Sequence, residues 1–258
     1  ATLAFAGCSA HHQPLLTAVN PGNWANKSID DEPKVFPGTG GTLSVDVESF
    51  GGDVMITGNE KLTETTVQIV RESVHGFGRS GDGKESLADI TWTAEIVPGE
   101  LGQVLQVRTS TTNAESHFQR AHVIIKGPSI DGVRVKTDGG RVYLKHIQGK
   151  VDVATADADV RVMTDLPMTH PVTVVNRDGD IDFRVRGEST ALFDAQTIDG
   201  TVSSRIRKGS VTVLPPLGED RLNAIFNDGK NPVTLRTVTG DIRIVVVPNP
   251  EQVGDMIF

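Results

Sequence analysis

Aspartates recur at fixed places in a pattern that repeats along this chain of 258 residues. Stacked in register, they would form columns of carboxylates with a separation of about 4.8 Å. Such columns suit Ca²⁺, which takes several oxygen ligands, and a facing pair would suit the acid and base of a glycosidase. The residues considered for a weak cation site are Asp157, Asp159, Asp178, Asp180 and Asp199.

A simpler interpretation is that these aspartates lie at solvated corners and bond to the nearby backbone. Their spacing lacks the nonapeptide repeat of calcium-binding β-helices. Lys136, Arg141 and Arg177 lie close enough in the sequence to compensate their charge. Capping aspartates are therefore the first expectation, and a cation site and catalysis remain as alternatives.

Motifs of known catalytic chemistry are absent from the sequence. Residues 76–81, GFGRSG, spell G-x-G-x-x-G but do not open a helix after a strand, which favours a loop. There is no phosphate-loop lysine, no G-x-S-x-G and no H-E-x-x-H motif. Scattered histidines are expected on the surface or in loops: His75, His117, His122, His146 and His170. The sequence thus predicts a non-enzyme with no catalytic residue, no metal and no cofactor.

The aspartates belong to a frame of twelve residues that occurs six times. Its copies begin at Val45, Val133, Val151, Val172, Phe193 and Val233. Positions 1, 3, 10 and 12 are apolar, apart from Ser204 at position 12, and position 5 is Ser, Thr or Asn. This alternation predicts a strand, a corner at positions 7 and 8, and a second strand.

Position 8 of the frame is the predicted corner residue. Glycine suits a corner that needs positive φ, so the one alanine is expected to mark a strained or differently shaped corner. The polar residues at position 5 would form a ladder if the copies stack in register. The corner residues are Gly52, Gly140, Ala158, Gly179, Gly200 and Gly240.

The spacing of the copies favours stacked coils over separate hairpins, although a two-residue hairpin would show the same alternation. From residue 133 the copies begin at intervals of 18, 21, 21 and 40 residues. The last interval is interpreted as two steps of about 20, with a degenerate copy or an inserted loop at 210–220. The predicted fold is all-β: a single-stranded β-solenoid, or β-helix, with irregular N-terminal strands and negligible helix. The stretch 57–132, including a Gly-rich loop at 75–86, is taken as part of this sheet system, with a small separate domain as the alternative.

The frame also carries a family resemblance. TLSVDVESFGGDVMITG, a variable middle, and HVIIKGPSIDGVRVKTDGGRVYLKHIQGKVDVATADADVRV resemble the bacterial putative adhesin domain over roughly residues 41–247. That family consists of envelope-associated β-solenoids whose molecular function is largely unassigned. The resemblance implies a solenoid fold and supplies no catalytic residues.

The N-terminal residues indicate a bacterial lipoprotein. Phe5-Ala6-Gly7-Cys8 resembles a lipobox, with Phe5 in place of the usual Leu, which makes Cys8 the predicted lipidation site. Ser9 after the cysteine favours the outer membrane. The expected division is a truncated signal peptide and lipobox at 1–8, a flexible tether at 9–40, the solenoid at 41–250 and a tail at 251–258.

The formal net charge of -8, without a basic cluster, argues against a nucleic-acid partner. The expected partners are the membrane, through the lipid on Cys8, and a protein or glycan surface. The chain is expected to be an adhesin-like scaffold of the cell envelope, with an envelope-stress or regulatory partner and a polysaccharide-active enzyme as alternatives. Outward residues proposed for contacts are Arg134, Lys136, Arg161, Arg184 and Arg186.

Overall fold

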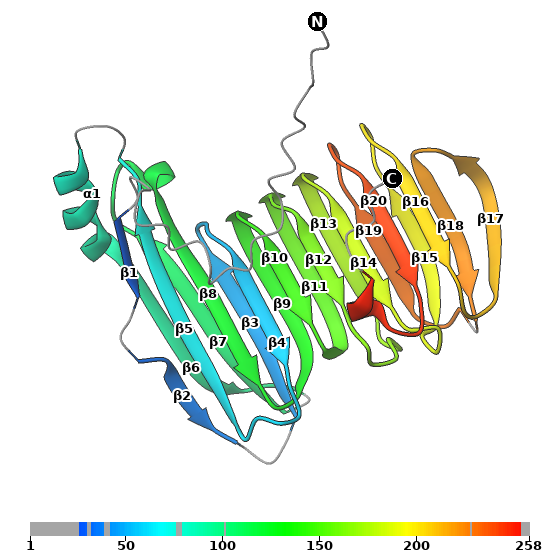
Figure 1. Ribbon diagram of the computed structural model, residues 1–258, viewed down its shortest axis with the longest axis horizontal. Coiled ribbons are helices and arrows are strands. Elements are labelled where there is room, and N and C mark those ends of the chain that lie inside the picture. Colours follow the sequence, from blue (N-terminus) through cyan, green and yellow to red (C-terminus); the bar gives the residue numbers. More distant parts are fainter. Residues whose placement is uncertain are drawn as a thin grey trace, which may run out of the picture.

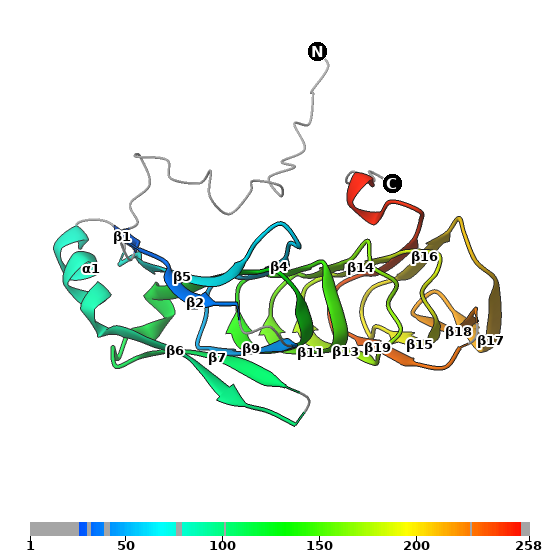
Figure 2. The same ribbon diagram turned by 90° about the horizontal axis from the view of Figure 1, so that it is seen from below.

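The structure, a computed structural model, describes residues 26–29, 32–38, 42–75, 79–100, 102–227 and 229–253. Its strands form two ten-stranded sheets, here called sheet A and sheet B. The sheets lie face to face as two layers of one elongated body (Figure 1, Figure 2). The predicted all-β solenoid is confirmed.

Six rungs make up the centre of this body. Each rung is one copy of the frame and consists of a strand in sheet B, a corner and a strand in sheet A. Neighbouring rungs pair in parallel and in frame register, so that Val142 lies between Val54 and Val160. In stacking order the rungs are β3 (Leu43–Ser49) with β4 (Val54–Gly58), β9 (Ile130–Gly139) with β10 (Val142–Lys145), β11 (Ile147–Asp157) with β12 (Val160–Met163), β13 (Val172–Asp178) with β14 (Ile181–Val185), β19 (Pro232–Arg236) with β20 (Ile242–Val246), and β15 (Ala191–Gln196) with β16 (Val202–Ile206).

The core lies between the two sheets and is built from the apolar frame positions. In the rung of β11 and β12, Val151, Val153, Val160 and Val162 are each at most 1% exposed. Alternate residues of the same strands face outward because successive side chains of a strand point to opposite faces. Full burial of one such side chain stabilises the fold by about 1.5–3 kcal/mol.

The order of the last two rungs differs from the sequence order. The rung of β19 and β20 lies between that of β13 and β14 and that of β15 and β16. The interval of 40 residues is therefore not two successive steps along the stack. The chain between these rungs forms an antiparallel hairpin of β17 (Val211–Gly218) and β18 (Arg221–Phe226), which extends sheet B beyond β15.

A similar insertion occurs at the N-terminal end. Parallel pairing with β3 and β4 makes β7 and β8 a further rung outside them, so the first rung of the chain is also internal. β6 pairs antiparallel with β7, β5 with β8, and β1 and β2 pair with β5. These elements are β1 (Asn26–Ile29), β2 (Lys34–Pro37), β5 (Glu64–Ser73), α1 (Ser80–Ser86), η1 (Leu87–Asp89), β6 (Ile90–Pro98), β7 (Gln103–Thr111), η2 (Ser116–Phe118) and β8 (Gln119–Gly127).

Two predictions fail in this region. Two strands, β1 and β2, lie inside the segment 9–40 predicted to be a tether, because the free edge of β5 offers them backbone partners. The Gly-rich segment 75–86 was expected to be a loop, yet its residues 80–86 form α1. Tertiary contact overrides the low helix propensity of glycine, since Gly83 and Ser86 of the helix are buried. Residues 76–78 and Cys8 lie outside the described residues.

A short C-terminal arm, residues 247–253, folds back over the outer face of sheet A (Figure 2). It includes η3 (Pro250–Gln252). The Val247 amide donates to the Val185 carbonyl at 3.1 Å, and the Arg184 guanidinium donates to the Val253 carbonyl at 2.5 Å. The arm explains why every residue of β14 is buried. Within the described part of the chain, no helix has the length and apolar character needed to cross a membrane.

Candidate functional site

The corner residues of the rungs stack directly on one another. A Cβ atom added to Gly179 would lie 2.7 Å from the carbonyl carbon of Ala158, closer than real Cβ contacts. Gly179 also has a φ of 120°, which glycine adopts at little cost. Ala158 is not among the described residues with positive φ, so its corner has a different backbone shape.

Polar residues at frame position 5 lie inside the corners and bind the corner carbonyls. Asn176 Nδ2 donates to the Ala158 oxygen at 2.6 Å, and Thr197 Oγ1 donates to the Gly240 oxygen at 2.9 Å. Both side chains are at most 3% exposed. Asn176, Thr197 and Thr237 therefore link neighbouring rungs through the corner backbone. Ser49 and Thr137 bond carbonyl groups of their own corners, and the buried Thr155 Oγ1 has no hydrogen-bond partner among the described residues.

Each aspartate at frame position 9 joins its own rung to the next. The Oδ1 atom of Asp159 accepts the amide N–H of Asp180 at 3.1 Å, and that of Asp180 accepts the amide N–H of Asp241 at 2.8 Å. Asp241 in turn accepts the amide N–H of Thr201 at 2.7 Å. In this column the carboxylates satisfy corner amides, which is the capping role expected first.

The aspartates at frame position 7 lie at the exposed end of the corner. Asp178 pairs with the Arg177 guanidinium at 2.8 Å, and this hydrogen bond holds the pKa of the Asp178 carboxyl below its usual range. Asp157 pairs with Asp178 in the strand register, and Asp199 bridges to Thr239. Cation binding by the position-7 and position-9 aspartates stays a prediction.

One close group of three metal-ligating side chains occurs among the described residues, and it lies away from these aspartates. It consists of His146, Asp165 and Glu251. The His146 ring contacts Asp165 Oδ1 through Nδ1 at 2.5 Å and Glu251 through Nε2. Lys145 Nζ lies 3.2 Å from the same Glu251 carboxylate. The contacts of Lys145 and His146 with Glu251 hold the C-terminal arm against the rung of β10.

A second histidine, His122 on β8, lies between two carboxylates. Its Nδ1 is 3.6 Å from Asp53 Oδ2, and its Nε2 is 3.4 Å from Glu72 Oε2. Burial opposes the charged ring, but the two carboxylates outweigh it and raise the pKa of His122 to about 9. Burial likewise opposes ionisation of Asp53, yet His122 and Arg141 lower the pKa of Asp53 to about 2. The group is thus a partly buried ion cluster.

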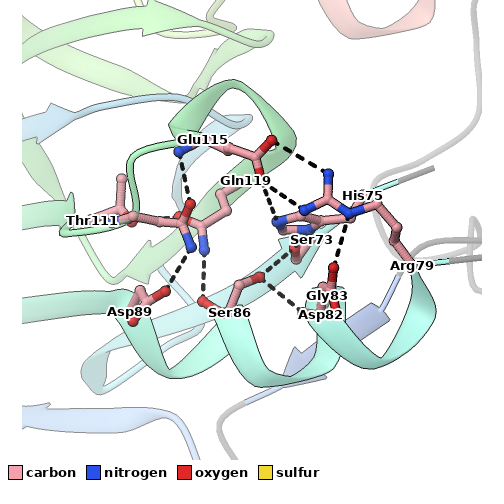
Figure 3. Close-up of polar contacts among 11 residues, drawn as sticks. Ser73, His75, Arg79, Asp82, Gly83, Ser86, Asp89, Thr111, Glu115 and Gln119 are labelled. Carbon is pink, nitrogen blue, oxygen red and sulfur yellow. Dashed lines mark hydrogen bonds and ion pairs between the residues drawn. The ribbon is translucent and has the colours of Figure 1, made fainter.

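A polar network of side chains lies under α1, at the N-terminal end of the body (Figure 3). Ser73 Oγ is 2.8 Å from His75 Nδ1 and 2.7 Å from Ser86 Oγ. Gln119 Nε2 donates to the Ser86 carbonyl at 2.6 Å. Glu115 lies 4.0 Å from His75 Nε2. Serine, histidine and carboxylate in this order resemble the set used for nucleophilic catalysis.

Burial gives this network a structural role instead. Ser73 and Gln119 are 0% exposed and His75 is 6% exposed, so no substrate reaches the hydroxyl. The nearest carboxylate, that of Glu115, is bound by the Arg79 guanidinium at 2.8 Å. The network fastens α1 to β5 and β8. His75 lies in the loop between β5 and α1, as expected, although its sequence context has no motif that would have indicated its burial. The expectation of a surface or loop histidine is wrong for His122, which lies on β8 with only 18% of its side chain exposed.

The outer face of sheet B carries two kinds of surface. Near β3 it is charged: Arg108 pairs with Asp46 at 2.8 Å, and Arg134 pairs with Glu48 at 3.1 Å. Exposed pairs of this kind contribute about 0–1 kcal/mol each. Lys136, predicted to be outward, is exposed on the same face. Of the outward residues proposed from the sequence, Arg184 is buried instead, because the C-terminal arm covers it.

Farther along, the same face becomes apolar at the corner edge. Val175 is 45% exposed, Val238 41% and Ile198 74%. Val238 and Ile198 are neighbours, since the Asp199 amide donates to the Val238 carbonyl at 2.7 Å. Val175 lies diagonally from Val238, because its direct partner in the register is Arg236. We call Val175, Ile198 and Val238 the apolar patch.

Comparison with known proteins supports the fold. The family model described as Toastrack DUF4097 matches residues 22–245. A putative cell adhesion protein from Clostridium sporogenes is 12% identical, with a TM-score of 0.62, over 86% of this chain and 99% of that chain. A putative adhesin from Bacteroides fragilis is also 12% identical, with a TM-score of 0.33, over 85% of this chain and 97% of that chain. No curated protein sequence matches the chain.

Proposed function

Because the chain belongs to the Toastrack DUF4097 family, we propose that it is a non-enzymatic, adhesin-like interaction scaffold of the bacterial cell envelope. The description of the structural neighbour from Clostridium sporogenes as a putative cell adhesion protein supports this proposal. The engagement of the chain's polar groups in structural contacts supports it as well. The Ser73–His75 network is closed to substrates, and the position-9 aspartates are occupied by backbone amides.

The apolar patch is the observation that carries the proposal. Large apolar side chains normally face the core, and a cluster of them on a solvent-exposed face marks an interaction site. Ile198 is the most exposed large apolar residue of the described chain at 74%. Val175 lies on β13, and Ile198 and Val238 lie in the corners that follow β15 and β19, where the backbone of one corner is hydrogen-bonded to that of the next. These bonds hold the patch in place, so little conformational entropy is lost on binding.

A protein is the partner that this patch fits better than a glycan. Sugar rings commonly pack on aromatic side chains, and the exposed large hydrophobic residues of the described chain are only Val, Leu and Ile. Arg177 and Asp178 border the patch and would supply the polar rim of a protein interface. A protein surface with apolar residues and a charged border is therefore the proposed ligand.

Attachment to the envelope is proposed through a lipid on Cys8, in the outer membrane. The support is the lipobox-like run Phe5-Ala6-Gly7-Cys8, followed by Ser9. Mass spectrometry of the protein purified from membranes should find Cys8 acylated and at the mature N-terminus. An unmodified chain that keeps residues 1–7 would overturn the anchor without affecting the interaction surface.

The interaction is tested by binding to purified envelope and cell-surface proteins and, in parallel, to a glycan array. The variant I198E should weaken protein binding tenfold or more, which corresponds to about 1.4 kcal/mol. The variant V35E is the matched control, because Val35 is 49% exposed but lies on β2 in the other sheet. Binding that responds equally to both variants, or binding to glycans alone, would contradict the proposal.

A further inference from the structure

The two sheets end in edge strands, whose unpaired N–H and C=O groups are open to pairing with another chain. Sheet A ends at β1 and β2 on one side and at β16 on the other, and sheet B ends at β6 and β17. Charged side chains commonly protect such edges. Among the edge strands whose side chains the structure describes, β2, β6 and β16 each carry one: Lys34, Glu95 and Arg205.

The edge strand β17 has no such protection. Its sequence from Val211 to Gly218, VTVLPPLG, contains no charged residue. Pro215 and Pro216 have no N–H and cannot donate to a new partner. The edge that remains open for strand pairing is therefore the uncharged segment from Val211 to Leu214.

The side chains of this segment also lack a cover. Val211 pairs with Phe226 and Val213 with Ala224, and directly opposed residues share one face of a sheet. Phe226 and Ala224 are 0% exposed, so that face is the core face. Yet Val211 is 41% exposed and Val213 47%. Sheet B continues through β18 and β17 beyond β15, while sheet A stops at β16, the partner of β15 in the last rung (Figure 1).

We propose that β17 pairs antiparallel with β17 of a second copy of this chain and forms a two-fold, end-to-end dimer. A two-fold contact brings a surface against itself, so it requires self-complementarity. An uncharged apolar strand meets this requirement without repulsion. The strand β16 at the same end does not, because Arg205 would face its own copy and Arg207 and Lys208 follow it closely.

In the dimer, sheet B of one copy continues into sheet B of the other. The core-facing valines of the two copies cover each other, which removes their exposed apolar area from water. The apolar patch lies on the outer face and is separated from β17 by β18. Self-association therefore goes beyond the proposed binding function and does not depend on it.

The mass of the protein in solution tests this proposal. Light scattering and sedimentation from low to high micromolar concentration should show a shift from one chain to two. The variant V213K, which places a charge against its own copy, should stay monomeric. V35K is the matched control: Val35 is 49% exposed, also lies on an edge strand, and should leave dimerisation unchanged.

Hydrogen exchange on the wild-type protein locates the contact independently of any variant. On dimerisation the amides of β17 should gain protection, whereas those of β6 should not. A chain that is monomeric at every concentration overturns the proposal and leaves the edge to a different partner. The proposal is also overturned by a dimer with unprotected β17, by a V213K dimer as stable as that of the wild type, or by growth beyond two chains. Because the apolar patch is untouched by V213K, binding by that variant reports on the proposed function separately.

Discussion

The two ends of the stack are closed by different means. At the N-terminal end, α1 and the antiparallel strands β5 and β6 flank the outermost rung, and a buried polar network fastens α1 to β5 and β8. At the C-terminal end, sheet B alone continues, as the β17–β18 hairpin, and sheet A simply stops. Ser204, the one polar residue at frame position 12, lies on β16 in this last rung and is exposed.

The difference shows that the repeated frame provides neighbours for the inner rungs but does not cover the ends of the stack. An inner rung buries its faces against two neighbours, whereas an end rung has one neighbour and needs a device outside the pattern. Both ends share one such device: the first and last rungs of the chain, β3–β4 and β19–β20, are inserted between other rungs. Each chain-terminal rung is therefore paired on both sides and protected from fraying.

The largest expected effect breaks an inner rung. G179A should destabilise the protein by about 3 kcal/mol or more, since a side chain there meets both an unfavourable φ and the Ala158 carbonyl. G81A, in α1 at the N-terminal end, is the control, because an added Cβ at Gly81 has no neighbour within 4 Å. That variant should be neutral or stabilising by up to about 1 kcal/mol. Urea denaturation measures both, and similar effects of the two substitutions would refute the distinction.

The next effect concerns the ion cluster at the N-terminal end and depends on pH. The folded protein raises the pKa of His122 from 6.5 to about 9. Its contribution is therefore fully present below pH 6.5 and is lost as pH rises through about 9. In urea denaturation from pH 6 to pH 10, the wild type should lose about 1–3 kcal/mol that H122Q does not lose.

The exposed His170 provides the control for this measurement. H170Q should follow the wild-type profile across the same pH range. Parallel profiles of H122Q and the wild type would show that the ring of His122 carries no folding-linked charge.

A smaller effect should stay local to the N-terminal end. S86A removes a hydroxyl that bonds Ser73 at 2.7 Å and the Gly83 carbonyl at 3.0 Å, at an expected cost of about 1–2 kcal/mol. Hydrogen exchange should become faster in α1 and β5 and stay unchanged in β11 and β13. The control S110A removes an exposed hydroxyl and should cost less than about 0.5 kcal/mol. Faster exchange throughout the rungs would mean that the two regions unfold as one unit.

The smallest effect concerns the aspartate ladder of the inner rungs. D180A removes the acceptor for the Asp241 amide and should cost about 1 kcal/mol, whereas D180N keeps an oxygen there and should cost less. Thermal unfolding with and without Ca²⁺ tests the cation prediction in the same variants. A rise in Tm with Ca²⁺ that D180A abolishes would show that the column also binds a cation.

The sequence predicts the rungs well because each rung is specified by residues that are close together in the sequence. Alternation around Val151 and Val160, with a small residue at the corner, specifies two strands and the face that each buries. It does not predict α1, in which two glycines occupy a helix that its buried contacts stabilise. Nor does it indicate the network of Ser73, His75 and Gln119, whose members come from β5, the loop after it and β8 and match no motif.

The sequence by itself determined the strand pattern, the corners, the inward faces and the family, since each depends on neighbouring residues or on a repeated frame. Only the tertiary structure decided the order of the rungs, because every rung presents the same frame. Val233 thus fits beside Val172 as well as beside Phe193. The tertiary structure likewise decided that the valines of β17 are exposed, because sheet A ends before it can cover them. It also decided that Arg184 is buried, because the C-terminal arm lies over it. No local sequence pattern encodes either outcome.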